Sequence, residues 1–183
     1  LLACGAQQPL PLGVPGGDLQ RVHQALPLLK RVNSGERVAL GPRVAVIGGG
    51  DSAVDAARAA RRCGGENVVI AYRRSRAEMP AREYELVEAE EEGVRIQERA
   101  APVAVRDLGD GLEVEFVGTV AGCVEPDGRR RPVPLPGTEF RLRVDDVVVA
   151  IGQQAAFAHW MRAFGLTPNE AGGVSCDPEI GAT

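Results

Sequence analysis

The sequence predicts an α/β fold in three layers, with a central parallel sheet and a small antiparallel β-meander. Three observations lead to this prediction. A short β-branched run ends in three glycines and is followed by a helix-like pattern, over residues 43–60. A second apolar, β-rich run follows at residues 67–72. Later, between residues 101 and 144, short strand-like runs alternate with turn residues, which is typical of hairpins.

The first of these features, Arg43–Ala53, is the stretch around which the chain is organised. Gly48, Gly50 and Ala53 fill the pattern G-x-G-x-x-G/A between a strand and a helix. Gly48 lets the chain turn sharply, Gly50 lets a pyrophosphate approach the backbone, and Ala53 keeps the helix near the sheet. Such a motif alone is a weak signal, but here the expected strand and helix flank it. It predicts a dinucleotide site at the start of the helix, where N–H groups face the phosphates.

The residues after the second strand, Asn67–Tyr72, indicate which dinucleotide is bound. An NAD-binding unit has an Asp or Glu here, which bonds the ribose 2′-hydroxyl. This chain has Arg73, Arg74 and Arg76 instead. Guanidinium groups bind a 2′-phosphate, which a carboxylate would repel. The alternative is an ordinary solvated basic loop, but its place in the motif favours NADP(H).

The remaining elements of the first two-thirds follow from apolar spacing and turn residues. Leu1–Ala6 is predicted as a buried strand that ends in a glycine turn. Asp18–Val32 has helical spacing, with Pro27 placed early in the helix or at a kink. Arg82–Glu92 is predicted as an acidic helix whose glutamates form a solvated face, not a metal or acid–base site. Val94–Gln97 returns as a third parallel strand.

After the third parallel strand, the sequence pattern changes to short strand-like runs, which predict the antiparallel meander. Ala101–Arg106, Leu112–Val117 and Phe140–Val144 are expected as strands, separated by turns within residues 109–111 and 118–137. The basic run Arg129–Arg131 is interpreted as part of a turn. Val147–Gly152 is another buried strand with a glycine exit. The tail is predicted to hold an amphipathic helix whose apolar residues are Phe157, Trp160, Met161 and Phe164.

Two similar strand-to-glycine exits, Leu1–Gly5 and Val147–Gly152, bracket the predicted dinucleotide domain. We therefore expect the dinucleotide domain at residues 42–149. Residues 1–41 would be the end of a segment of another domain with its linker, and residues 150–183 an incomplete return into that domain. The abrupt beginning and end suggest an excerpt from a longer chain.

Composition excludes several other functions. The chain has 183 residues, a net charge of −4 and 44% hydrophobic residues, and its basic clusters are too local to bind nucleic acid. No apolar run approaches membrane-spanning length. Its four cysteines, Cys4, Cys63, Cys123 and Cys176, form no C-x-x-C, so no metal site, iron–sulfur cluster or redox dithiol is predicted. Scattered thiols without a secretory feature fit a cytoplasmic protein.

Over nearly its whole length the chain resembles the NADPH-dependent glutamate synthase small (beta) subunit and related flavoprotein reductases with two dinucleotide-binding domains. The resemblance is carried by Val-Ala-Val-Ile-Gly-Gly-Gly-Asp-Ser-Ala-Val-Asp at 44–55 and Tyr-Arg-Arg-Ser-Arg-Ala-Glu-Met-Pro at 72–80. Glu-Glu-Gly-Val at 91–94, Ala-Ile-Gly-Gln at 150–153 and Gly-Val-Pro-Gly-Gly-Asp-Leu at 13–19 follow the same pattern. The block at 72–80 is more specific than the glycine motif.

The resemblance implies an NADPH domain inserted into an FAD domain. Hydride would pass from NADPH to FAD, and electrons would leave through iron–sulfur clusters to a large, glutamate-producing subunit or another acceptor protein. FAD would be bound in the parent chain, and the excerpt alone would bind NADP(H) without turnover. The resemblance implies three sets of residues at the cofactor. Those at the pyrophosphate would be Gly48, Gly49, Gly50, Asp51, Ser52 and Ala53, and those at the 2′-phosphate Arg73, Arg74 and Arg76. A hinge turn near the nicotinamide would be formed by Ala150, Ile151 and Gly152.

No side chain is expected to act as an acid or base, because the cofactors carry the chemistry. For Asp51, Asp55 and Glu78 we expect helix capping, packing or surface ion pairs. Two alternatives stay open. One keeps the fold and changes the acceptor: an NADPH:ferredoxin or transhydrogenase-type subunit, or the reductase half of a larger dehydrogenase. The other is a non-catalytic NADPH sensor. Thioredoxin reductase has a similar layout, but its C-x-x-C is missing here.

Overall fold

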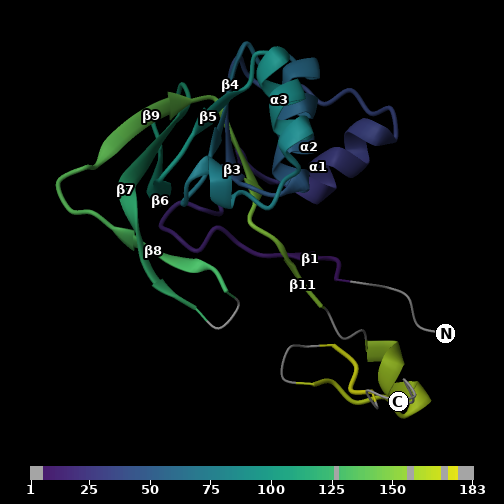
Figure 1. Ribbon diagram of the computed structural model, residues 1–183. Coiled ribbons are helices and arrows are strands. Elements are labelled where there is room, and N and C mark those ends of the chain that lie inside the picture. The colour runs from purple at the N-terminus through teal and green to yellow at the C-terminus, as the bar shows by residue number, and fades with distance from the viewer. Residues whose placement is uncertain (1–5, 126–127, 156–158, 170–172, 177–183) are drawn as a thin grey trace. The chain divides into compact units, whose positions relative to one another are not determined.

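A computed structural model describes residues 6–125, 128–155, 159–169 and 173–176 (Figure 1). The chain divides into two compact units, one formed by Pro11–Ile151 and the other by Leu1–Leu10 together with Gly152–Thr183. The expected strand at Leu1–Ala6 lies, except for Ala6, outside the described residues, and so does Phe157.

A five-stranded sheet forms the centre of the larger unit, and all its neighbouring strands are parallel. In spatial order the strands are β2 (Val22–Gln24), β10 (Asp146–Ala150), β3 (Arg43–Gly48), β4 (Asn67–Ala71) and β5 (Arg95–Gln97). The predicted strand–helix–strand unit and the third parallel strand are thus confirmed. The sheet continues from β3 to β4 on one side and receives β10 on the other. The strand order therefore switches direction between β3 and β10, where ligands of such sheets bind.

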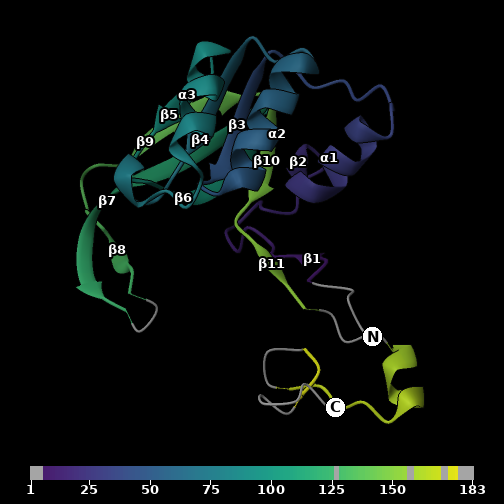
Figure 2. The same ribbon diagram turned by 45° about the vertical axis from the view of Figure 1, so that its right-hand side comes forward.

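Three helices cover one face of this sheet: α1 (Ala25–Asn33), α2 (Asp51–Arg62) and α3 (Glu83–Glu91) (Figures 1 and 2). Alternate residues of β3 divide between the two faces. Val44 and Val46 pack with the helices, whereas Ala45 and Ile47 belong to the core on the opposite face. α2 turns a stripe of buried alanines toward the sheet, and side chains this small let the helix lie close to it.

An antiparallel layer covers the other face, as predicted. It consists of β6 (Ala100–Asp107), β7 (Leu112–Val124) and β9 (Phe140–Val144), with β7 paired to both neighbours. Phe116 and Phe140 stack on each other with their ring centroids 5.2 Å apart. Phe116 is 1% exposed and lies in the core between this layer and the parallel sheet.

The long turn predicted at residues 118–137 is wrong. β7 continues to Val124 and pairs with β8 (Arg130–Pro134), so that Arg130 and Arg131 are strand residues. We call residues 119–134 the β7–β8 arm; it extends beyond the rest of the antiparallel layer (Figure 2). Its glycines and prolines indicate turns in the sequence. Proline is nevertheless tolerated in an edge strand, and β8 lies at the edge of its sheet.

The helix predicted over Asp18–Val32 is only half right. Its first part forms β2, and α1 begins at Ala25, which places Pro27 in the first turn where proline is tolerated. β2 pairs with β10, and His23 Nε2 lies 2.7 Å from Asp146 Oδ1. This long-range pairing overrides the helical spacing of the apolar residues.

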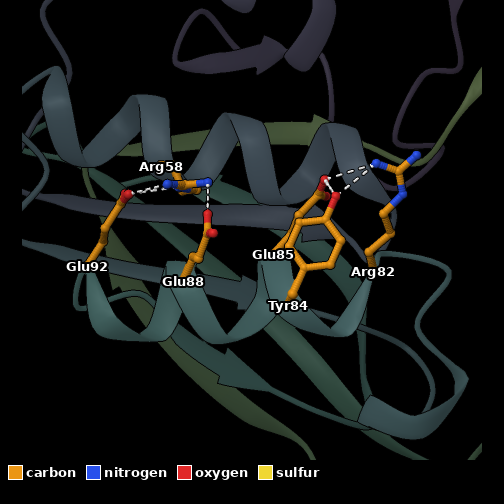
Figure 3. Close-up of polar contacts among 6 residues, drawn as sticks. All are labelled: Arg58, Arg82, Tyr84, Glu85, Glu88 and Glu92. Carbon is orange, nitrogen blue, oxygen red and sulfur yellow. Dashed lines mark hydrogen bonds and ion pairs between the residues drawn. The ribbon is translucent and has the colours of Figure 1, made fainter.

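The acidic run of α3 is joined to α2 by ion pairs, so it is not simply a solvated face (Figure 3). Arg58 of α2 donates from Nε to Glu92 Oε1 at 2.8 Å and from Nη1 to Glu88 Oε2 at 2.9 Å. At the other end of α3, Arg82 Nη1 donates to the hydroxyl of Tyr84 at 3.0 Å. Among the described residues, no group of three or more histidine, cysteine or acidic side chains could hold a metal ion.

The described part of the smaller unit contains the antiparallel pair of β1 (Gln8–Pro9) with β11 (Gln153–Gln154), a short 3₁₀ helix, η2 (His159–Phe164), and an isolated antiparallel bridge between Pro168 and Val174. The predicted tail helix is therefore only a 3₁₀ turn. Met161 is buried, whereas Phe164 is 76% exposed. Within the described parts of both units, no helix is long and apolar enough to cross a bilayer.

Candidate dinucleotide-binding site

The glycine turn leaves β3 at the point where the strand order switches. Gly48 pairs in register with Ala150 of β10, and its φ of +149° favours glycine. A Cβ on Gly48 would lie 2.3 Å from the carbonyl oxygen of Ala150. Glycine is therefore required here by the neighbouring strand, in addition to the sharp turn that the sequence predicted.

Gly50 meets a different surrounding, because the space beside it is open. A Cβ there would have only one atom within 4 Å, the Cγ of Pro80 at 3.7 Å. Gly50 is the N-cap of α2, and no side chain caps this end of the helix. The first N–H groups of α2 and the positive end of its dipole thus adjoin open space, which is the arrangement that binds phosphates. Because residue 50 has no side chain, a bulky group can approach the backbone here.

The other residues of the turn have structural contacts. A Cβ on Gly49 would lie 2.4 Å from the Tyr72 ring, so Gly49 makes room for that ring. Ala53 is fully buried under the sheet, as predicted. Asp51 and Ser52 are exposed in the first turn of α2, next to the open space.

The segment after β4 is tied to this turn by two hydrogen bonds, and a third hydrogen bond lies within the segment. Ala81 N donates to Gly49 O at 3.1 Å, and Arg82 N donates to Asp51 Oδ1 at 3.3 Å. The Tyr72 hydroxyl donates to the carbonyl of Glu78 at 3.0 Å. Pro80 is thereby held beside Gly50, so the sequence block at 72–80 forms one wall of the site.

A shallow basic depression, open to solvent, lies at the end of β4. Four of its lining residues are arginines and one is a glutamate. The lining residues are Arg73, Arg74, Glu78, Arg99, Thr119, Val120, Ala121, Arg130 and Pro132. Such a depression suits an anion, because it presents several guanidinium groups from three parts of the chain.

Of the three predicted arginines, Arg73 and Arg74 line this depression and have different surroundings. Arg73 is exposed, and we find no hydrogen bond or ion pair of its side chain within the described part of the chain. Arg74 is only 6% exposed; its Nε donates to the carbonyl of Arg130 at 2.7 Å, and its Nη2 lies 3.8 Å from Glu125 Oε2. Arg74 therefore fastens the β7–β8 arm to the end of β4.

Arg76 does not line the depression. Its guanidinium pairs with Glu83 at 2.9 Å and with Glu90 at 2.7 Å, both on α3, and its N–H donates to Glu98. A contact between Arg76 and the 2′-phosphate stays a prediction. For Arg76 to make it, its ion pairs with Glu83 and Glu90 would have to break.

Sequence reasoning missed Arg99, Thr119 and Arg130. Arg99 follows β5, the neighbour of β4, so the predicted parallel pair of strands contained a signal for it. Thr119 and Arg130 belong to the β7–β8 arm, which was predicted as a turn and gave no such signal.

The predicted hinge residues divide between the two units. Ala150 ends β10 beside Gly48, and Ile151 follows it with 41% exposure. Gly152 belongs to the smaller unit, where its carbonyl accepts from Leu10 N at 3.1 Å.

The acidic residues near the site have structural partners. Glu78 completes a capping box with Ser75, whose hydroxyl donates to Glu78 Oε2 at 2.6 Å. This hydrogen bond holds the pKa of Glu78 below its ordinary value, with a smaller contribution from Arg74 and Arg99. Glu78 is thus ionised at neutral pH, which suits capping and not proton transfer. Of the cysteines, Cys63, Cys123 and Cys176 are free thiols, and Cys4 lies outside the described residues.

Fold and site together define a dinucleotide-binding α/β domain of the type found in oxidoreductases. Residues 1–182 match the family model described as pyridine nucleotide-disulphide oxidoreductase. The chain belongs to that family.

Two relatives and one solved structure illustrate the match. The chain is 39% identical over 193 residues to the glutamate synthase (NADPH) small chain of Halomonas elongata, covering 99% of this chain and 40% of that protein. It is 40% identical over 157 residues to the NADPH-Fe(3+) oxidoreductase subunit beta of Geobacter sulfurreducens, covering 83% of this chain and 23% of that protein. It thus spans less than half of either relative. The structure of Mycobacterium tuberculosis FprA in complex with NADPH is similar in fold, with a TM-score of 0.69, 18% identity, and coverage of 96% of this chain and 55% of that one.

Proposed function

We propose that this chain is the NADP(H)-binding part of a flavin-dependent oxidoreductase of the glutamate synthase small-chain type. The Gly48–Gly50 turn and the first turn of α2 would bind the pyrophosphate. The basic depression would bind the 2′-phosphate, with Arg73 as its exposed arginine and Arg74 beside it. Ala150 and Ile151, next to Gly48, would lie along the nicotinamide side of the cofactor, followed by Gly152.

One observation carries the proposal: an uncapped helix N-terminus beside open space at Gly50, with an arginine-lined depression at the end of the next strand. The first feature suits a pyrophosphate and the second an additional phosphate; NADP(H) carries both, whereas NAD(H) lacks the second. The names of the two relatives support the same cofactor, since both contain NADPH.

The bound nicotinamide would supply the hydride, and a flavin in the same protein would exchange it. This chain's residues bind and orient the dinucleotide. The α2 N-terminus provides positive charge at a fixed place, and the arginines provide guanidinium groups that form charge-assisted hydrogen bonds with a phosphate. No described acidic residue near the site is assigned proton transfer, because Asp51 and Glu78 both accept structural hydrogen bonds.

The electron acceptor and the partner are also part of the proposal. Because relatives are named as a small chain or a beta subunit, we propose that electrons pass to a partner subunit. Their transfer through iron–sulfur clusters to a larger subunit is proposed from the resemblance to the glutamate synthase small subunit. A reductase subunit serving another acceptor is the second candidate. It is favoured by a 44% identity over 144 residues to the NADP(+)-dependent formate dehydrogenase subunit beta of Moorella thermoacetica. The free cysteines fit a cytoplasmic location.

Calorimetric titration with NADPH and, separately, with NADH tests the cofactor. We expect much tighter binding of NADPH. Arg73→Ala should weaken NADPH binding by about 10- to 150-fold, which corresponds to about 1.5–3 kcal/mol for a hydrogen bond to a charged group. NADH binding should stay unchanged, because NADH has no 2′-phosphate.

Glu66→Gln offers a control at an exposed residue that does not line the site. It should leave both affinities at their wild-type values. Equal affinity of the wild-type protein for both nucleotides, or an equal loss of both on Arg73→Ala, would contradict the assignment of the 2′-phosphate.

A further inference from the structure

Arg99 stands out because of its backbone. Among the residues that the structure describes, it alone has a positive φ without being glycine, at +53°. Residues with a Cβ seldom adopt this left-handed conformation. Two hydrogen bonds hold it there: Arg99 N donates to Arg74 O, and Thr119 N donates to Arg99 O, both at 2.9 Å. The backbone of Arg99 is thus fixed between the end of β4 and the β7–β8 arm.

The sheet register places Arg99 beside Arg73. Ala71 of β4 is paired with Gln97 of β5 in a parallel ladder. Arg73 and Arg99 each stand two residues beyond this pair, at the same edge of the sheet. Both are exposed, and both line the basic depression. Their neighbouring positions give the depression two guanidinium groups from adjacent strands.

Two of the other charged groups of the depression, Arg74 and Glu78, have partners already, while Arg130 is an exposed arginine of the β7–β8 arm. The Nε of Arg74 is committed to the Arg130 carbonyl, and the arginine itself is buried. The Glu78 carboxylate accepts hydrogen bonds from both the hydroxyl and the N–H of Ser75. For Arg73 and Arg99 we find no side-chain hydrogen bond or ion pair within the described ranges. These two arginines can therefore turn toward a ligand without breaking a hydrogen bond or ion pair.

We propose that Arg99 is a second specificity-determining residue, which binds the 2′-phosphate of NADP(H) together with Arg73. This inference rests on the function proposed above and adds a residue to it. A 2′-phosphate carries close to two negative charges, and two guanidinium groups bind it with several charge-assisted hydrogen bonds. Arg74 then serves to hold the β7–β8 arm, whose Thr119 fixes the Arg99 carbonyl.

The test compares Arg99→Ala with Arg95→Ala, measured by titration of the intact protein with NADPH and with NADH. Arg95 is an exposed arginine of β5 that does not line the depression, so its removal changes the net charge equally. We expect Arg99→Ala to weaken NADPH binding by about 10- to 150-fold, the range for one hydrogen bond to a charged group. NADH binding should change less than about twofold, and Arg95→Ala should affect neither nucleotide.

Arg99→Gly guards against a folding defect, since glycine adopts a φ of +53° without strain. It should show the same selective loss with an unchanged melting temperature. Unchanged NADPH affinity in both Arg99 variants, or an equal loss for NADPH and NADH, would overturn the inference. If instead the wild-type protein bound neither nucleotide, or both equally, the proposed function itself would fail.

Discussion

Gly50→Val separates cofactor binding from folding. Gly50 has φ −94° and ψ 177°, an extended conformation that valine adopts readily, and the space beside it is open. Valine is a poorer N-cap than glycine, which should lower the free energy of unfolding by about 1 kcal/mol. In a protein of this size that corresponds to a fall of about 2–4 °C in the melting temperature. The valine methyl groups would occupy the space into which the pyrophosphate comes. We therefore expect a folded protein that binds neither NADPH nor NADH.

Gly48→Ala is the matched control, two residues away. Its Cβ would lie 2.3 Å from the Ala150 carbonyl oxygen at a φ of +149°. Backbone strain of about 1–3 kcal/mol and overpacking of similar size add to a loss of about 4 kcal/mol, or about 8–16 °C. Melting by circular dichroism and nucleotide titration distinguish the two variants. Wild-type affinity in Gly50→Val would refute the pyrophosphate position, and a large fall in its melting temperature would refute the open space.

Two further predictions concern stability. Asp145 accepts hydrogen bonds from Arg43 N and Nε at 2.8 and 3.1 Å, and these hold its pKa below the ordinary value of 3.8. A depressed folded-state pKa stabilises the protein above the unfolded-state value, and this contribution is lost as the pH falls through the folded-state pKa. Asp145→Asn should therefore lower the free energy of unfolding at pH 7 and flatten its fall below about pH 4, measured by urea titration. An equal pH dependence in both proteins would contradict this. Phe116→Ala should cost about 3–5 kcal/mol, because Phe116 is fully buried against Phe140, whereas Val124→Ala, at a residue 61% exposed, should cost less than about 0.5 kcal/mol. Similar losses would show that the antiparallel layer is not part of the core.

Local signals predicted much of the fold. The run from β3 into α2 combines an apolar strand, three glycines and a helical alanine pattern, all within twenty residues. Each signal acts over a few residues, and none is opposed by a distant contact. The place of the arginines in the motif predicts a contact with the 2′-phosphate, and this stays a prediction; the structure shows that Arg73 and Arg74 line the basic depression.

The failures in the larger unit involve contacts between residues far apart in the sequence. Val22–Gln24 has helical spacing in the sequence but pairs with β10, more than a hundred residues later. The β7–β8 arm contains glycines and prolines and yet forms a hairpin at a sheet edge. Arg99 was missed although the predicted parallel strands placed it near the end of β4, because its position beside Arg73 becomes definite only with the register of the two strands. The ion pairs of Arg58 likewise depend on how α2 and α3 pack (Figure 3).

The β7–β8 arm leaves and rejoins the antiparallel layer at nearly the same place. Phe116 of β7 pairs with Phe140 of β9, and just beyond this pair Gly118 N donates to Thr138 Oγ1 at 3.0 Å while Leu135 N donates to Gly118 O at 2.8 Å. The base of the excursion is thereby closed, so insertions and deletions in the arm leave the register of the layer intact. The same arm supplies Thr119 and Arg130 to the basic depression, so on the function proposed above an exchange of this hairpin would change the surroundings of the 2′-phosphate and leave the glycine turn and its helix unchanged.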